Sequence, residues 1–223
     1  MEARAATDPD GARLRTTDGI LLDTPRGPAR VHLELPETLP PRAALVLGHG
    51  AGGGVGAPDL QAAARTALGL GIAVTLVEQP YRVAGRRSPV PAPALDEAWT
   101  AVVAHLCGHQ LAGLPVITGG RSSGARVACR TAAATGASAV LCLAFPLLPP
   151  TRRGFTREPV SRLPELEAVT VPVLIVQGAG DRFGMPPAGP SRTVITVAGD
   201  HGLKTDRGAI ESAITAWLTP VIA

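Results

Sequence analysis

Near the middle of the chain the sequence reads Leu114-Pro115-Val116-Ile117-Thr118-Gly119-Gly120-Arg121-Ser122-Ser123-Gly124-Ala125-Arg126-Val127-Ala128. A short apolar run, a Gly-x-Ser-x-Gly pattern and an alanine-rich run are typical of a strand, a sharp turn and a helix. We expect the strand over 116–118 and the helix over 123–135. Such a tight turn forces Ser122 into strained backbone angles and lifts its hydroxyl above the sheet. The positive end of the helix then points at the position where negative charge would develop.

Apolar runs and helical stretches alternate on both sides of this turn. Two short runs, 14–23 and 29–35, predict an antiparallel hairpin at a sheet edge. The other predicted strands are 43–47, 72–77, 139–145, 172–177 and 193–197, and the other predicted helices are 58–70, 96–109 and 208–218. This alternation predicts the α/β class, with a mostly parallel central sheet, an N-terminal antiparallel hairpin, helices on both faces and no large lid.

Composition limits the class of protein. With 223 residues, 45% of them hydrophobic and 17% charged, we expect a globular chain with one domain over 13–223 behind a flexible tail, 1–12. A net charge of +3 without a Lys/Arg block, and only 3% aromatic residues, argue against nucleic acid as a partner. The N-terminal segment has no apolar centre, so we do not expect a secretory signal. The sequence contains no run of about 18 apolar residues, so we expect no membrane span.

The residue types that bind metals are poorly spaced for a metal site. Cys107, Cys129 and Cys142 are far apart and form no CxxC pair, which favours buried free thiols and a reducing, cytoplasmic location. His105 and His109 have the i, i+4 spacing of a metal pair, but no glutamate lies between them, so packing is the favoured interpretation. We expect neither a metal nor a cofactor.

A serine becomes a nucleophile only when a base takes its proton and a third group orients that base. After a nucleophile of this strand–turn–helix type, the acid and the histidine follow in chain order. His201 is the only histidine after Ser122, and it follows a predicted strand. Asp181 ends another apolar strand and is the preferred acid. Asp200 is the weaker alternative, because side chains of adjacent residues usually point apart.

The developing oxyanion needs backbone N–H donors. One would come from Ser123, and the second from the glycine-rich loop after 43–47, with Ala51 the first choice and Gly52 the second. That loop lacks both a Gly-Lys-Ser/Thr sequence and the dinucleotide-binding spacing, which argues against a phosphate site. His49 precedes the serine, so we interpret it as a brace for this loop and not as the base.

Five short segments resemble one family: His49 to Gly52, Glu78 to Arg82, Gly119 to Ser122, Asp181 to Gly184 and Gly199 to His201. From about Leu14 to its end, the chain resembles the α/β-hydrolase superfamily. It is most similar to the small, lidless, dienelactone-hydrolase-like group near the bacterial relatives of a testis-expressed hydrolase-like protein. The resemblance implies Ser122 as nucleophile, Asp181 as acid and His201 as base. Relatives often carry Pro-Leu-His where this chain has Pro146-Leu147-Leu148.

Two connections, 81–87 and 149–157, are predicted to form the walls of the site. The candidate substrate contacts are Tyr81, Arg82, Phe145, Leu148 and Phe183. Arg82, Arg152, Arg153 or Arg157 could bind an anionic group of the substrate. The favoured interpretation is that these arginines are simply solvated in their loops.

The predicted function is a serine hydrolase that cleaves a small ester, thioester or related acyl substrate through an acyl-enzyme. The alternatives are a non-enzymatic binding or scaffold protein on the same fold, and a peptidase with the same triad. The expected partner is a small-molecule acyl substrate, and the protein is expected to be a monomer or homodimer without membrane contact.

Overall fold

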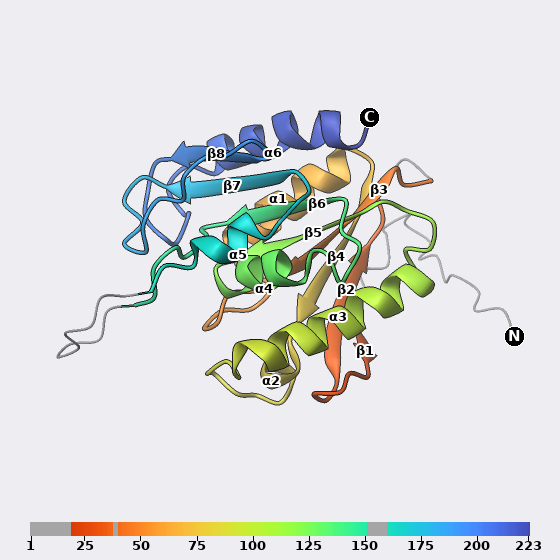
Figure 1. Ribbon diagram of the computed structural model, residues 1–223. Helices are drawn as coiled ribbons and strands as arrows, with labels where there is room; N and C mark the ends of the chain where they lie inside the picture. The colour runs from red at the N-terminus through yellow and green to blue at the C-terminus, as the bar shows by residue number, and fades with distance from the viewer. Residues whose placement is uncertain (1–18, 38–39, 151–159) are drawn as a thin grey trace, which may run out of the picture.

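The computed structural model describes residues 19–37, 40–150 and 160–223. The predicted tail 1–12, the first part of the predicted hairpin (14–18) and Arg152, Arg153 and Arg157 lie outside the described residues. The described strands form one eight-stranded sheet in the order β1-β2-β4-β3-β5-β6-β7-β8 (Figure 1). They are β1 Ile20–Leu22, β2 Ala29–Glu34, β3 Ala43–Gly48, β4 Ile72–Glu78, β5 Val116–Arg121, β6 Ala139–Leu143, β7 Val173–Gly178 and β8 Arg192–Val197.

The sheet is parallel from β4 to β8 and antiparallel at its N-terminal end. β1 pairs with β2 and β2 with β4 in antiparallel registers, and every other pairing is parallel. Both faces of the central strands are buried. In β3, Leu45 and Leu47 join one core cluster, while Ala44 and Val46 join the cluster on the opposite face. The predicted α/β class, with its N-terminal hairpin, is confirmed.

Helices cover the two faces in separate groups (Figure 1). α1 Pro58–Gly69 and α6 Arg207–Val221 pack together on one face, over the cluster that contains Leu60 and Ile214. The opposite face carries α3 Ala92–Gly108, α4 Ser123–Thr131 and α5 Leu163–Glu167. A four-residue helix, α2 Pro80–Val83, follows β4. None of the helices in the described ranges combines the length and the apolar character needed to cross a membrane.

Some boundaries differ from the sequence prediction. β5 continues past Thr118 to Arg121, because Gly119 and Gly120 pair with Leu141 and Cys142 of β6. Glycine is required at position 119, where a Cβ atom would overlap the carbonyl oxygen of Leu141. The sequence prediction gave neither α2 nor α5, since both are short and contain proline.

The sheet reverses its strand order at β3. The chain leaves β3 for α1 and β4 on one side, and then returns to place β5 on the other side. Loops that follow strands on either side of such a reversal diverge, which leaves a crevice at the carboxyl edge of the sheet. The loop after β3 and the turn after β5 both lie at this edge. In the described part of the chain, no connection there forms a long lid.

Candidate active site

Ser122 lies in the turn between β5 and α4 with φ 52° and ψ −106°. A residue other than glycine in such a conformation carries strain of about 1–3 kcal/mol and persists only where its surroundings hold it. Here the Ser122 N–H donates to the Leu143 carbonyl (2.9 Å), and the Ser122 carbonyl accepts from the Arg126 N–H (3.2 Å). Hydrogen bonds on both sides of Ser122 therefore hold this strained conformation between β5 and α4.

Glycines bring the backbone of three segments into contact beside this turn. A Cβ atom at Gly120 or at Gly124 would overlap the carbonyl oxygen of Gly48, at the end of β3. A Cβ atom on Gly50 would lie 3.7 Å from the Cβ atom of Ser122. The start of α4 therefore packs directly on the loop after β3, and this loop runs past the serine.

His201 connects the serine to a carboxylate. Its Nε2 atom lies 2.9 Å from the Oγ atom of Ser122, and its Nδ1 atom lies 2.8 Å from Oδ2 of Asp181. An ionised carboxylate only accepts hydrogen bonds, so we assign the ring proton to Nδ1, which donates to Asp181. Nε2 is then left to accept the Ser122 hydroxyl proton. This is the tautomer that a general base for the serine requires.

The Asp181 carboxylate is held from two further directions. Its Oδ2 atom accepts from the Gln177 side-chain amide (2.9 Å) and its Oδ1 atom accepts from the Phe183 N–H (2.9 Å). Only 1% of the Asp181 side chain is exposed. The sequence analysis missed Gln177, although a single polar side chain at the end of the apolar strand β7 was a usable signal. Gln177 is fully buried and also donates to the Phe145 and Gly184 carbonyls.

The alternative acid, Asp200, is occupied within its own loop. Its Oδ1 atom accepts a hydrogen bond from the Gly202 N–H (2.7 Å). The ring nitrogen Nδ1 of His201 is paired with Asp181 instead. The structure joins Ser122, His201 and Asp181 in one chain of hydrogen bonds, which we call the relay. Asp200 lies outside it.

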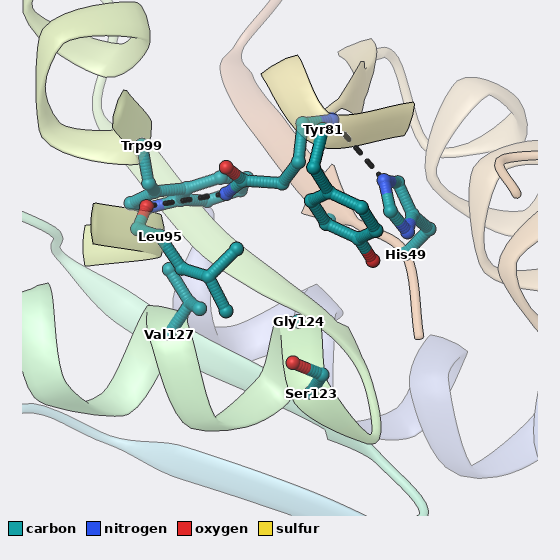
Figure 2. A pocket seen from close by; sticks show the side chains of 9 residues that line it. His49, Tyr81, Leu95, Trp99, Ser123, Gly124 and Val127 are labelled. Carbon is teal, nitrogen blue, oxygen red and sulfur yellow. Dashed lines mark hydrogen bonds between the residues drawn. The ribbon is translucent and has the colours of Figure 1, made fainter. Parts of the chain in front are cut away.

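His49 braces the loop after β3, as its position in the sequence predicted. Its Nδ1–H donates to the Gly50 carbonyl (2.8 Å), and its Nε2 atom accepts from the backbone N–H of Gln79 (3.1 Å; Figure 2). Burial lowers the pKa of this imidazole below its usual 6.5 and so favours the neutral ring that this pattern requires. The hydroxyl of Tyr81 adds a second support by donating to the Ala51 carbonyl (2.9 Å).

The predicted oxyanion donors retain free backbone N–H groups. In residues 19–37, 40–150 and 160–223, the N–H groups of Ala51, Gly52 and Ser123 donate no hydrogen bond. Ser123 is the first residue of α4, where helix N–H groups are unpaired and the helix dipole is positive. Its side chain borders a small cavity that is also lined by His49, Tyr81 and Trp99 (Figure 2).

The candidate substrate contacts occupy different places. The Phe183 ring meets the His201 ring edge-on, with centroids 4.5 Å apart, and the Leu148 N–H donates to the Phe183 carbonyl (2.8 Å). Tyr81 is buried beside the loop after β3. Arg82, on α2, donates to the Arg86 carbonyl (3.4 Å).

The prediction that Phe145 contacts the substrate is wrong, because its side chain is fully buried and offers no surface to a ligand. Ala144 adopts a positive φ of 49° at the end of β6, and Phe145 beyond it packs in the core with Leu166 and Ile175.

The remaining polar candidates take part in packing. His105 and His109 stack with their ring centroids 4.3 Å apart, and the Nδ1–H of His109 donates to the His105 carbonyl (2.8 Å). The Sγ atoms of Cys129 and Cys142 lie 3.5 Å apart in the core, while Cys107 is only half-buried, contrary to expectation. Within the described ranges, no three His, Cys, Asp or Glu side chains are grouped as a metal site would need.

Comparison with known proteins identifies the family. A search of curated proteins gave no match. Among solved structures, the chain is similar to XC6422 from Xanthomonas campestris, described as an α/β serine hydrolase without a lid (21% identity, 90% of this chain and 95% of that one, TM-score 0.67). It is also similar to Est1E from Butyrivibrio proteoclasticus (15%, 92% and 99%, 0.74) and to a dienelactone hydrolase from Anabaena variabilis (15%, 91% and 96%, 0.69). The family model described as "Alpha/beta hydrolase domain" matches residues 41–213, so the chain belongs to the α/β-hydrolase family.

Proposed function

We propose that this protein is a serine hydrolase that cleaves a small ester, thioester or related acyl substrate. Ser122 is the nucleophile, His201 the general base and Asp181 the acid that orients it. The observation that carries the proposal is the continuous relay from Ser122 Oγ to His201 Nε2 (2.9 Å) and from His201 Nδ1 to Asp181 Oδ2 (2.8 Å). This arrangement is the one that activates a serine hydroxyl.

The first half of the reaction forms the acyl-enzyme. The Ser122 oxygen attacks the substrate carbonyl while its proton passes to Nε2 of His201, and Asp181 stabilises the imidazolium that results. The oxyanion is bound by the N–H groups of Ser123 and Ala51, with Gly52 as the second choice in the loop. Collapse of this intermediate breaks the bond to the leaving group, which takes the proton from His201.

The second half returns the enzyme to its starting state. A water molecule gives a proton to Nε2 of His201 and attacks the acyl carbon, and the same N–H groups bind the second oxyanion. Collapse then releases the carboxylic acid and returns the proton to Ser122. Apart from the substrate and the water molecule, the groups that act in these steps all belong to the chain.

Two features favour esters and similar compounds over the alternatives. All three side chains of the relay are present and within hydrogen-bond distance, which a scaffold protein would not need. The described connections at this edge form no long lid, and the similar structures include a dienelactone hydrolase, so we favour a compact substrate over a peptide. We further propose a cytoplasmic protein, because its three cysteines are free thiols.

The proposal is tested with a fluorophosphonate probe, which reacts with activated serines, on the wild type, Ser122→Ala and Ser123→Ala. We expect one probe per chain on the wild type and on Ser123→Ala, which keeps its backbone N–H, and no probe on Ser122→Ala. An unlabelled wild type, or labelling that persists in Ser122→Ala, would reject the assignment.

A panel of p-nitrophenyl esters and peptide anilides then separates an esterase from a peptidase. We expect turnover of short-chain esters and little turnover of the anilides. The reverse order of rates would favour the peptidase.

A further inference from the structure

Arg121, the residue before Ser122, contacts three separate segments of the chain. Its Nε atom lies 2.8 Å from Oδ2 of Asp59 on α1, and its Nη2 atom donates to the backbone carbonyl of His201 (2.9 Å). On a third side, its Nη1 atom lies against Gly50, where a Cβ atom would come within 3.0 Å of it. One guanidinium therefore touches the loop after β3, the start of α1 and the loop that carries the base.

The pairing with Asp59 is a buried one. The Asp59 side chain has no exposed surface, and only 19% of the Arg121 side chain is exposed. The Nε–H does not point straight at Oδ2, so the contact is an ion pair and not a well-aligned hydrogen bond. Burial raises the pKa of the Asp59 carboxyl, and the Arg121 charge opposes this effect. A carboxylate buried in this way depends on its cation, and it fixes where that cation lies.

Asp59 is itself held in place, because its Oδ1 atom accepts from the Leu60 N–H (3.0 Å) in the first turn of α1. The planar guanidinium presents its donors in fixed directions. The ion pair with Asp59 holds the Nε side of the guanidinium beside α1, and in this position Nη2 reaches the carbonyl of His201. A lysine in this place has a single ammonium group on a flexible stem and would not reproduce the two fixed contacts.

From these contacts we infer that Asp59 and Arg121 form a positioning pair for His201. Asp59 orients the guanidinium, and the guanidinium holds the main chain of His201 so that Nε2 stays at reacting distance from Ser122. The inference rests on the proposed function, in which His201 is the base. Neither residue touches the reacting atoms, and both act through the placement of His201.

The chain offers a matched control in Arg130, one of the last residues of α4. Arg130 pairs with Asp96 through two contacts (2.6 and 2.8 Å), and 18% of its side chain is exposed, close to the 19% of Arg121. It also pairs with Glu165 (3.3 Å) and contacts no residue of the relay. Its removal reports the cost of losing arginine ion pairs that lie away from the relay.

The experiment measures kcat and KM for the preferred ester with Arg121→Met, Arg121→Lys, Asp59→Asn and Arg130→Met. We expect Arg121→Met to lower kcat by about a hundredfold with KM within about twofold, since a displacement of about 1 Å is enough for such a loss. Arg121→Lys should have a kcat close to that of Arg121→Met. Asp59→Asn should have a kcat between those of Arg121→Met and the wild type. Asp59→Asn combined with Arg121→Met should cost no more than Arg121→Met alone, because both act through one contact. Arg130→Met should keep the wild-type kcat.

A second readout does not depend on activity. Amide hydrogen exchange over residues 199–203 should become faster in Arg121→Met and Asp59→Asn and stay unchanged in Arg130→Met. Equal kcat in Arg121→Met and Arg130→Met, or unchanged exchange in this loop, would overturn the inference. If Arg121→Met does not fold, Arg121→Lys and Asp59→Asn carry the same test. A wild type that no fluorophosphonate labels would reject the proposed function instead, and the exchange data would still decide whether Arg121 holds the loop.

Discussion

The Nε2 atom of His201 lies 2.9 Å from the Oγ atom of Ser122, although 79 positions separate the two residues in the sequence. Ser122 follows a central strand and His201 follows the edge strand β8, with β6 and β7 between them in the sheet. The loop after β8 crosses the end of β7, where the Gly180 N–H donates to the Gly199 carbonyl (2.8 Å). A Cβ atom on Gly178 would overlap the Asp200 carbonyl oxygen, so this crossing requires glycine.

Asp181→Asn is expected to lower kcat by about 10⁴-fold, because an amide in place of the carboxylate disturbs the His201 tautomer and no longer stabilises the imidazolium. The matched control is Asp200→Asn, whose carboxylate binds within its own loop. Its kcat should stay within a few-fold of the wild type. Ester hydrolysis under saturating substrate measures kcat for the two variants. A larger loss of kcat in Asp200→Asn than in Asp181→Asn would assign the role of the acid to Asp200 instead.

Tyr81→Phe removes the hydroxyl that donates to the Ala51 carbonyl (2.9 Å). We expect a loss of about 1 kcal/mol in the free energy of unfolding and a several-fold lower kcat, since the loop that carries the proposed oxyanion donor loses a support. Thr135→Val removes a similar bond, from the Thr135 hydroxyl to the Thr131 carbonyl (2.9 Å) beyond the far end of α4. Urea unfolding and ester kinetics on both variants should show similar losses of stability, and a lower kcat in Tyr81→Phe alone.

Gly124→Ala should destabilise the protein by several kcal/mol, because the new methyl group would overlap the Gly48 carbonyl and backbone cannot move aside cheaply. Gly69→Ala is the control, since a Cβ atom at this last residue of α1 meets no atom within 4 Å. That variant should be neutral or more stable by up to about 1 kcal/mol. Thermal unfolding followed by circular dichroism compares the two, and equal melting temperatures would contradict the packing argument.

The His49 pair of hydrogen bonds predicts a pH dependence of stability. Burial holds the pKa of folded His49 below 6.5, so as the pH falls below about 6.5 the unfolded chain binds a proton that the folded chain does not. The free energy of unfolding should therefore fall between pH 7 and pH 5, with a contribution from His49 of up to about 1.4 kcal/mol per pH unit. His49→Gln should show a shallower fall in urea titrations over this range. Parallel curves for the two proteins would assign the dependence to other groups.

The sequence predicted the parts of the fold that arise from local patterns. Continuous apolar runs predicted β3 and β7, because strands buried on both faces need no alternation. Chain order and strand ends were enough to select His201 and Asp181 as candidates. The end of β5 was misplaced, since Gly119 and Gly120 resemble a turn in isolation and pair with β6 only in the folded sheet.

The residues that the sequence analysis missed or misjudged depend on contacts that only the folded chain makes. Arg121 and Asp59 belong to different elements, and nothing in their local patterns indicates that they meet. Gln177 is one polar residue in an apolar strand, and its role appears only with the turn that brings Asp181 back to it. Phe145 follows a strand end, as catalytic and binding residues often do, but the positive φ of Ala144 precedes a residue packed in the core.

The contact between Arg121 and the His201 carbonyl joins the margin of the sheet to its centre. β8 is an edge strand whose outer residues are largely exposed, and such strands open first when a protein is warmed. His201 follows this strand in the chain, yet its main chain is bound to a residue of β5. The residue that we propose as the base is thereby bound to the centre of the sheet. We therefore expect heat inactivation to follow the unfolding of the central strands and not the local opening of β8.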